Sequence, residues 1–155
     1  MGPAGATDDW VAIMGAPLPV ADALAWVTTP GYGAQVLFTG TVRDHAEGRP
    51  GVQALTYEAY EGPATDRLAQ IATSARARWD IGRVALLHRV GRLRLTEVAV
   101  VVAVGAAHRE PAFAAARWCI DEAKATAPIW KREHFEGGDG WATGAQPLRA
   151  VGEPH

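Results

Sequence analysis

Residues 98–134 read VAVVVAVGAAHREPAFAAARWCIDEAKATAPIWKREH, and this stretch passes from a strand pattern to a helix pattern and back. Val98 to Val104 is a continuous apolar run of strand length. Pro111 suits the first turn of a helix, and the Ala127-Pro128 pair ends that helix. Residues 129–134 then have the pattern of an extended segment. The face of this helix that we expect to point inward carries Phe113, Ala116, Ile120 and Ala123.

The same two periodicities occur outside this stretch. Alternating apolar residues predict strands at Trp10 to Met14, Ala34 to Val42, Val52 to Tyr60 and Val84 to Val90. Helical spacing predicts a helix from Pro19 to about Val27, with Val20, Leu24 and Val27 on one face, and another from Gly62-Pro63 onward, with Leu68, Ile71, Ala72, Ala75 and Trp79 on one face. Several neighbouring strands are joined too closely for helical crossovers. We therefore expect an α+β fold with mixed, largely antiparallel sheets and about three helices.

Glycine and charged residues mark the breaks between these elements. Gly40 lies inside a predicted strand, where it indicates a bulge or a close backbone approach. Asp44 to Gly51 is charged and rich in turn residues, so we expect a flexible connection there. Gly91 indicates a turn region between two strands, and Gly137 to Gly140 a further turn.

The chain has 155 residues, a length that fits one domain. We expect this domain at residues 10–141, between a loose N-terminus of residues 1–9 and a tail of residues 142–155. The net charge of −2 gives no field that would attract nucleic acid. The longest apolar run, Val98 to Ala107, is far shorter than the roughly 20 residues of a membrane span. We therefore expect a cytoplasmic protein with neither a nucleic-acid nor a membrane partner.

The residue types that are scarce in this chain exclude several classes of enzyme. Cys119 is the only cysteine, which excludes an internal disulfide, and its place in mid-helix predicts a buried core thiol. The chain has no Asn and a single Ser, Ser74, which excludes a Cys-His-Asn triad and a Gly-x-Ser-x-Gly hydrolase. His45, His88 and His134 lack the spacing of metal ligands, so we expect no metal site.

Lys124 and Lys131 are the only two lysines in the chain. Lys124 falls in the last turn of the predicted helix, and Lys131 follows the Pro128 break on the next extended segment. Because the break forces the chain to turn, both amines can converge on one pocket, hold an anion and lower each other's pKa. The alternative is a lysine that complements the helix dipole and a second lysine in solvent.

Two further positions suggest an anion site. His108 and Arg109 stand where a strand ends and the helix with Pro111 begins, and free backbone amides beside a guanidinium favour a phosphate. Arg43 lies at the end of the strand that begins at Ala34. The alternatives are a solvent-facing turn for the first position and a surface arginine for the second.

Taken together, these segments resemble the MoaE family, the large catalytic subunit of molybdopterin synthase. The resemblance runs in unbroken order over about residues 10–141. The segment at residues 128–133 combined with the His-Arg pair is highly specific, whereas each piece alone is weak. The stretches that carry it are Phe38-Thr39-Gly40-Thr41-Val42-Arg43, Leu55-Thr56-Tyr57-Glu58-Ala59-Tyr60, His88-Arg89-Val90-Gly91-Arg92-Leu93, Ala107-His108-Arg109, Ile120-Asp121 and Pro128-Ile129-Trp130-Lys131-Arg132-Glu133.

The resemblance implies a hammerhead-like fold and a sulfurtransferase that converts cyclic pyranopterin monophosphate to the dithiolene of molybdopterin. Sulfur then arrives as a C-terminal thiocarboxylate on a small ubiquitin-like subunit, and no resident cofactor or metal is implied. Lys124 and Lys131 match the family's catalytic lysines. The implied substrate-binding positions are Thr41, Val42, Arg43, His108, Arg109, Lys124, Lys131, Arg132 and Glu133.

The resemblance also implies an assembly. The family forms a heterotetramer around a homodimer of large subunits, so His108 and Arg109 are candidates to serve the neighbouring protomer's site. Two other functions stay open at this stage. One is a non-catalytic module of the same fold that docks a ubiquitin-like tail. The other is a phosphate-ester enzyme, although the sequence offers it no convincing metal ligands or nucleophile.

Overall fold

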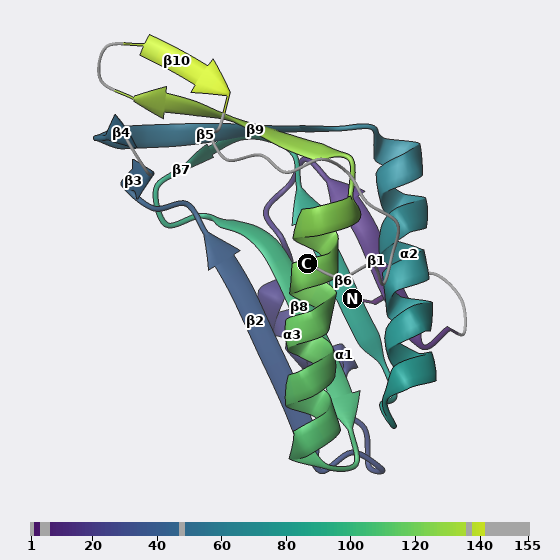
Figure 1. Ribbon diagram of the computed structural model, residues 1–155. Coiled ribbons are helices and arrows are strands. Elements are labelled where there is room, and N and C mark those ends of the chain that lie inside the picture. Colours follow the sequence, from purple (N-terminus) through teal and green to yellow (C-terminus); the bar gives the residue numbers. More distant parts are fainter. Residues whose placement is uncertain (1, 4–6, 47–48, 136–137, 142–155) are drawn as a thin grey trace.

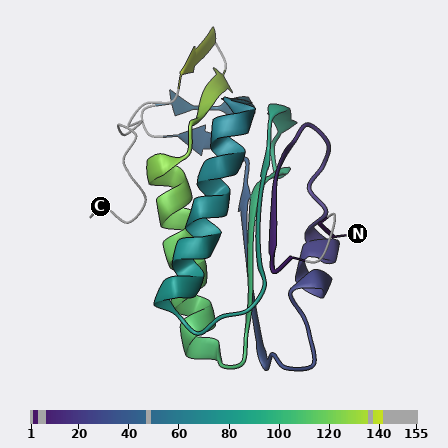
Figure 2. The same cartoon turned by 90° about the vertical axis from the view of Figure 1, so that its right-hand side faces the viewer.

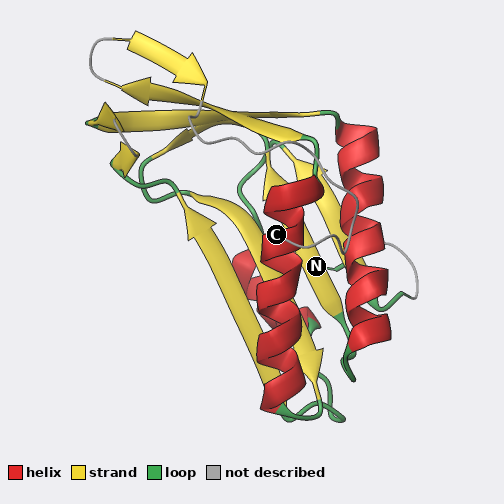
Figure 3. Cartoon of the chain, in the orientation of Figure 1, coloured by secondary structure: helices red, strands yellow, loops and turns green. Residues whose placement is uncertain are grey.

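Three helices, two four-stranded sheets and a short two-stranded sheet make up the described part of the chain (Figure 3). The structure, a computed structural model, describes residues 2–3, 7–46, 49–135 and 138–141. The helices are α1 (Val20–Trp26), α2 (Glu61–Arg78) and α3 (Arg109–Thr126). The strands are β1 (Asp9–Met14), β2 (Ala34–Thr41), β3 (His45–Ala46), β4 (Arg49–Pro50), β5 (Val52–Ala59), β6 (Val84–Arg89), β7 (Gly91–Arg94), β8 (Val98–Ala106), β9 (Ile129–Phe135) and β10 (Gly138–Trp141).

The first sheet has the strand order β1-β6-β8-β2 and lies between the helices. α2 and α3 cover one of its faces and α1 covers the other (Figure 2). β1 runs parallel to β6, whereas the other two pairs are antiparallel. This arrangement confirms the predicted α+β fold with largely antiparallel pairing. Within the described ranges, every helix falls short of the length and apolar character that a membrane crossing requires.

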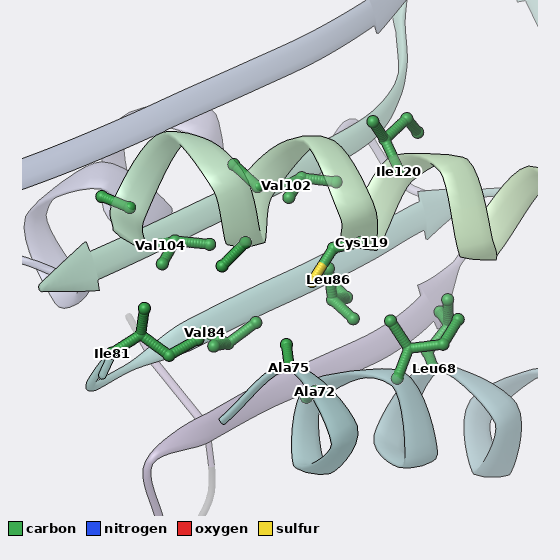
Figure 4. Packing of buried hydrophobic residues seen from close by; sticks show 14 of the residues in the cluster. Leu68, Ala72, Ala75, Ile81, Val84, Leu86, Val102, Val104, Cys119 and Ile120 are labelled. Carbon is green, nitrogen blue, oxygen red and sulfur yellow. The ribbon is translucent and has the colours of Figure 1, made fainter. Parts of the chain in front are cut away.

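β8 is buried on both faces, so its apolar run contributes to two cores. Val102 and Val104 point toward α2 and α3 and pack with Leu86 in the first core (Figure 4). Val101 and Ala103 point the other way and pack beneath α1 in the second core. Burying one such aliphatic side chain contributes about 1.5–3 kcal/mol. The sheet and its three helices are thereby held together as one unit.

The second sheet, of order β10-β9-β5-β7, lies beyond the C-terminal end of α3 (Figure 1). Its pairs are all antiparallel. Leu55 and Leu93 belong to a third core on its inner face. On its outer face, His134 is hydrogen-bonded to Thr56 (2.6 Å) and to Asp139 (2.7 Å), which ties β10 and β9 to β5.

Most predicted elements are present, but two expected core positions were wrong. Leu24 in α1 is 39% exposed and Phe113 in α3 is 63% exposed. Alanines face the sheet instead, because Ala23 and Ala112 are fully buried. Small side chains let the helices approach the sheet closely, and the larger residues point to solvent.

The expected turns are in part strands. The region of Gly91 forms β7, which pairs with β5, and β10 begins at Gly138. The expected flexible connection from Asp44 to Gly51 contains β3 and β4, which pair with each other. β1 begins at Asp9, inside the expected loose N-terminus. Residues 4–6, residues 47–48, Gly137 and the predicted tail of residues 142–155 lie outside the described residues.

The ring of Tyr32 fills the space between Gly82 and Gly105. A Cβ on Gly105 would lie 2.1 Å from the carbonyl oxygen of Val27 and 2.7 Å from Cδ2 of Tyr32. The backbone at this point is also fixed, because the Gly82 N–H donates to the carbonyl of Gly105 (2.8 Å). A side chain at position 105 therefore has no room.

We predict that Gly105→Ala lowers the free energy of unfolding by at least about 1–3 kcal/mol, because the added methyl group overpacks a fixed site. Denaturant unfolding of the purified chain measures this. Gly62→Ala is the control, since a Cβ on Gly62 meets nothing within 4 Å and alanine favours a helix. Equal stability of the Gly105 variant and the natural chain would contradict the packing described.

Candidate active site

Lys124 and Lys131 lie on either side of the connection between α3 and β9. The helix ends because the backbone of Ala127 is extended (φ −76°, ψ 133°), the conformation preferred before a proline. Pro128 follows, and β9 begins at the next residue. The break thus turns the chain within two residues and starts β9 at the C-terminal end of α3, as predicted.

The charges of Lys124 and Arg43 act on the amine of Lys131. The pKa of Lys131 is lowered, first by burial and then by these two positive charges. The carboxylate of Glu133 acts in the opposite direction and raises that pKa. The two lysines therefore interact electrostatically, and their convergence on one anion-binding pocket stays a prediction. We call Lys124, Lys131 and Arg43 the cation cluster.

Lys131 is half-buried because it lies between two apolar cores. Side chains alternate along a strand, so Lys131 shares the inner face of β9 with Ile129 and Glu133. Ile129 packs against the first core. On the neighbouring strand β5, Tyr57 lies opposite Lys131 and Leu55 lies opposite Glu133. Leu55 belongs to the third core, and Tyr57 packs against it. The stem of the lysine therefore has apolar neighbours in both directions along the sheet.

Arg43 is positioned by the residue before it. Val42 is only 2% exposed and packs in the third core. Its N–H donates to the carbonyl of Glu97 (3.0 Å), and its own carbonyl accepts from the N–H of Thr96 (2.7 Å). Because the side chain and both backbone groups are engaged, Val42 anchors the end of β2. A contact between Val42 and a substrate stays a prediction.

The predicted bulge lies just before this anchor. The register of β2 against β8 shifts between Gly40 and Thr41. A Cβ on Gly40 would lie 2.6 Å from Cγ1 of Val100, so the close backbone approach is present as well. Thr41 is exposed beyond the bulge, near the cluster in sequence, and its role in binding stays a prediction.

His108 and Arg109 lie at the opposite end of α3 from the lysines. His108 is the N-cap residue and Arg109 is the first residue of the helix. At 1.5 Å per residue, Arg109 and Lys124 are roughly 22 Å apart along the helix axis. A single chain therefore does not bring the His-Arg pair to the cation cluster. Its expected contribution to a neighbouring protomer's site stays a prediction.

Arg132 and Glu133 lie on opposite faces of the second sheet. Glu133 is 2% exposed on the inner face, beside Lys131. The guanidinium of Arg132 lies on the outer face, 3.6 Å from a carboxylate oxygen of Glu58 and 5.4 Å from the ring centre of Trp141. The two adjacent predicted binding residues therefore do not line one pocket within a chain.

Cys119 is a buried core thiol, as predicted. It is fully buried in the first core, where its sulfur lies near Leu86 (Figure 4). Burial raises the pKa of this thiol to about 12. Within the described part of the chain, no group of three His, Cys, Asp or Glu side chains is placed to hold a metal ion.

Neither Tyr57 nor His88 stands out from the sequence pattern as a neighbour of the site. Their rings are in edge contact, with centres 4.8 Å apart. Tyr57 falls inside the strand predicted from Val52 to Tyr60, and His88 lacks the spacing of a metal ligand. The alternation of Leu55 and Tyr57 assigns the tyrosine to the inner face, but only the register of β5 against β9 brings it to Lys131.

Comparison with known proteins places the chain in a family. The family model described as MoaE protein matches residues 13–126. The molybdopterin synthase catalytic subunit of Halalkalibacterium halodurans is 43% identical over 130 residues, which cover 84% of this chain and 83% of that relative.

Solved structures share the fold. The crystal structure of molybdopterin synthase from Staphylococcus aureus has a TM-score of 0.80 and 32% sequence identity, and covers 88% of this chain and 98% of its own. A complex of subunits 1 and 2 of the molybdopterin-converting factor from Helicobacter pylori has a TM-score of 0.75 over 94% of this chain and 98% of its own. At 19% identity, that second likeness shows the fold alone.

We predict that Cys119 in the native chain reacts very slowly with thiol reagents. With a pKa of about 12, its thiolate population near neutral pH is roughly a thousandfold below that of an exposed cysteine, and burial blocks access as well. Labelling with a thiol-reactive chromophore, in the native chain and in denaturant, measures the difference. Equal rates in both states would contradict a core role for this thiol.

Proposed function

The chain belongs to the MoaE family, and on that premise we propose that it is the catalytic subunit of a molybdopterin synthase. It acts as a sulfurtransferase that takes sulfur from the C-terminal thiocarboxylate of a small ubiquitin-like subunit. The acceptor is cyclic pyranopterin monophosphate, and the product is the dithiolene of molybdopterin. The chain needs no resident cofactor for this reaction in our proposal.

The observation that carries the proposal is the cation cluster. It includes the only two lysines of the chain. Burial first, and then the positive charges of Lys124 and Arg43, lower the pKa of Lys131. Both proposed reactants are anions, a thiocarboxylate and a phosphate. Partly buried cations stabilise such anions more strongly than fully exposed cations do, because less water screens the attraction.

We assign different tasks to the two lysines. Lys124 is exposed at the end of α3, where it can meet the tail of the partner and neutralise its thiocarboxylate. Lys131 is half-buried, and its lowered pKa makes the neutral amine more available near neutral pH than in an ordinary lysine. The neutral amine accepts a proton and the ammonium returns one as sulfur is transferred.

The bonds that change define what the site must accommodate. Each transfer forms a carbon–sulfur bond on the side chain of the pterin and breaks a carbon–oxygen bond at the same carbon, whose oxygen leaves as water or stays on the phosphate. It also breaks the bond between sulfur and the acyl carbon of the tail. Water supplies the oxygen that replaces sulfur, so the tail leaves as a carboxylate. A dithiolene contains two sulfurs, so two charged partner molecules must act in turn.

The other predicted residues belong to substrate binding in this proposal. Arg43 holds the phosphate beside the lysines, so that the reacting carbon stays within reach of the sulfur. His108 and Arg109 are about one helix length away, and we assign them to the site of the neighbouring protomer in a homodimer. With one small subunit on each large subunit, the assembly is a heterotetramer.

We predict that Lys124→Ala and Lys131→Ala each lower the rate of dithiolene formation by about a hundredfold or more, the usual contribution of a positioned acid or base. The assay mixes the purified chain with a thiocarboxylated small subunit and cyclic pyranopterin monophosphate. Binding of the small subunit to each variant is measured in parallel.

Arg117→Ala is the matched control for the loss of a cation from α3. Arg117 is 86% exposed and pairs only loosely with Asp121 (3.8 Å), so its removal leaves the rate unchanged. If the unmodified chain binds the small subunit but yields no product, the protein is a docking module and the proposed activity is wrong. Full activity of both lysine variants would remove the cation cluster from the mechanism.

A further inference from the structure

Tyr57 is the side chain that directly faces Lys131 across the second sheet. The two residues are paired in the antiparallel ladder of β5 and β9. Residues paired in this way point to the same face, with Cβ atoms roughly 4.5–5.5 Å apart. On its other side Tyr57 is paired with Gly91 of β7. Gly91 has no side chain to share that face, so the tyrosine ring has one large neighbour in the ladder, Lys131.

His88 fixes the tyrosine ring from behind. It lies on β6, and its ring meets that of Tyr57 edge-on, with an angle of 68° between the planes. Nδ1 of His88 donates a hydrogen bond to the carbonyl of Arg89 (2.8 Å), which sets the tautomer and the orientation of the imidazole. Burial lowers the pKa of His88 to about 4. The residue is therefore neutral near pH 7 and adds no charge beside the lysine.

The ring of Tyr57 is held by packing against the third core. Burial raises the pKa of Tyr57, which favours the neutral phenol. Tyr57 thus acts on its neighbours as an uncharged aromatic ring that covers apolar and half-buried groups.

We propose that Tyr57, backed by His88, is a positioning residue that closes the β5 side of Lys131 to water and directs its amine toward Lys124 and Arg43, the other members of the cation cluster. The proposal rests on the proposed function for the use of Lys131 in catalysis, and it names residues that act on that lysine without touching the reactants. In this proposal the amine of Lys131 stays half-buried because the aromatic ring of Tyr57 covers one side of it.

The groups that face Lys131 come from five parts of the chain. They are Lys124 from α3, Arg43 from the segment after β2, Glu133 from β9, Tyr57 from β5 and, behind it, His88 from β6. Lys124 and Arg43 lower the pKa of Lys131, whereas Glu133 raises it. Tyr57 and His88 are uncharged, so their effect comes through the exclusion of water, which disfavours the ammonium form.

The chain permits a direct test, because it contains only two lysines. Trace acetylation with acetic anhydride over a range of pH, followed by peptide mass spectrometry, reports the titration of each ε-amine separately. The full-length chain is used without partner or substrate, so the result does not depend on activity. Lys124 serves as an internal standard in every sample.

We predict that Tyr57→Ala moves the labelling midpoint of Lys131 to higher pH, because water enters where the ring was removed. Tyr57→Phe keeps the midpoint, since it keeps the ring and loses only the hydroxyl. His88→Ala moves the midpoint in the same direction as Tyr57→Ala but less, because it only loosens the ring. Glu58→Gln, next to Tyr57 but on the outer face, is the matched control and leaves Lys131 unchanged.

Thermal unfolding of each variant separates positioning from stability. A lower Tm with an unmoved Lys131 midpoint in Tyr57→Ala would overturn the proposal, as would a shift of equal size in Tyr57→Phe. If Tyr57→Ala does not fold, Tyr57→Val replaces it, because valine suits a strand but is too short to cover the lysine. An unmoved midpoint in a reconstituted, active enzyme refutes only this inference. A shifted midpoint in a chain that never makes product refutes only the proposed function.

Discussion

The connection of two residues between α3 and β9 is the constraint on which the rest of the site depends. It joins a helix that covers the first sheet to a strand in the middle of the second, so the two sheets meet at the end of α3. Lys124 precedes this junction and Lys131 follows it. A longer connection would no longer fix the position of the second sheet relative to α3, and the two lysines would lie farther apart. The same junction brings the first and third cores together, and this is why Lys131 is half-buried.

The cation cluster carries an electrostatic cost in the empty chain. Three positive groups lie close together, and burial of Lys131 takes one of them partly out of water. The lowered pKa of Lys131 is one response to this cost, and the buried carboxylate of Glu133 beside it is another. In the proposed function, an anionic reactant bound there offsets the remaining repulsion.

Much of the fold follows from sequence patterns, but the composition of the site does so only in part. The apolar run of β8 and the helical spacing in α2 indicate their elements without help, and the Pro128 break predicts that the lysines converge. Leu24 and Phe113 show where the patterns fail, because periodicity does not reveal that a helix packs through alanines. The partnership of Tyr57 with Lys131 depends on strand register, which arises from long-range pairing. The separation of Arg109 from Lys124 follows from helix length alone and required no structure.

Arginine and lysine carry different kinds of charge in this chain: the arginine charge is permanent, and the lysine charge is adjustable. Guanidinium groups stay protonated at any pH at which the chain is folded, whereas an amine titrates when its surroundings change. Arginine is the cation in the ion pairs of Arg76 with Asp9, of Arg89 and Arg94 with Glu97, and of Arg132 with Glu58. Both lysines stand in the cluster. A rise in pH through the titration of Lys131 therefore changes the charge of the cluster and leaves these arginine charges as they were.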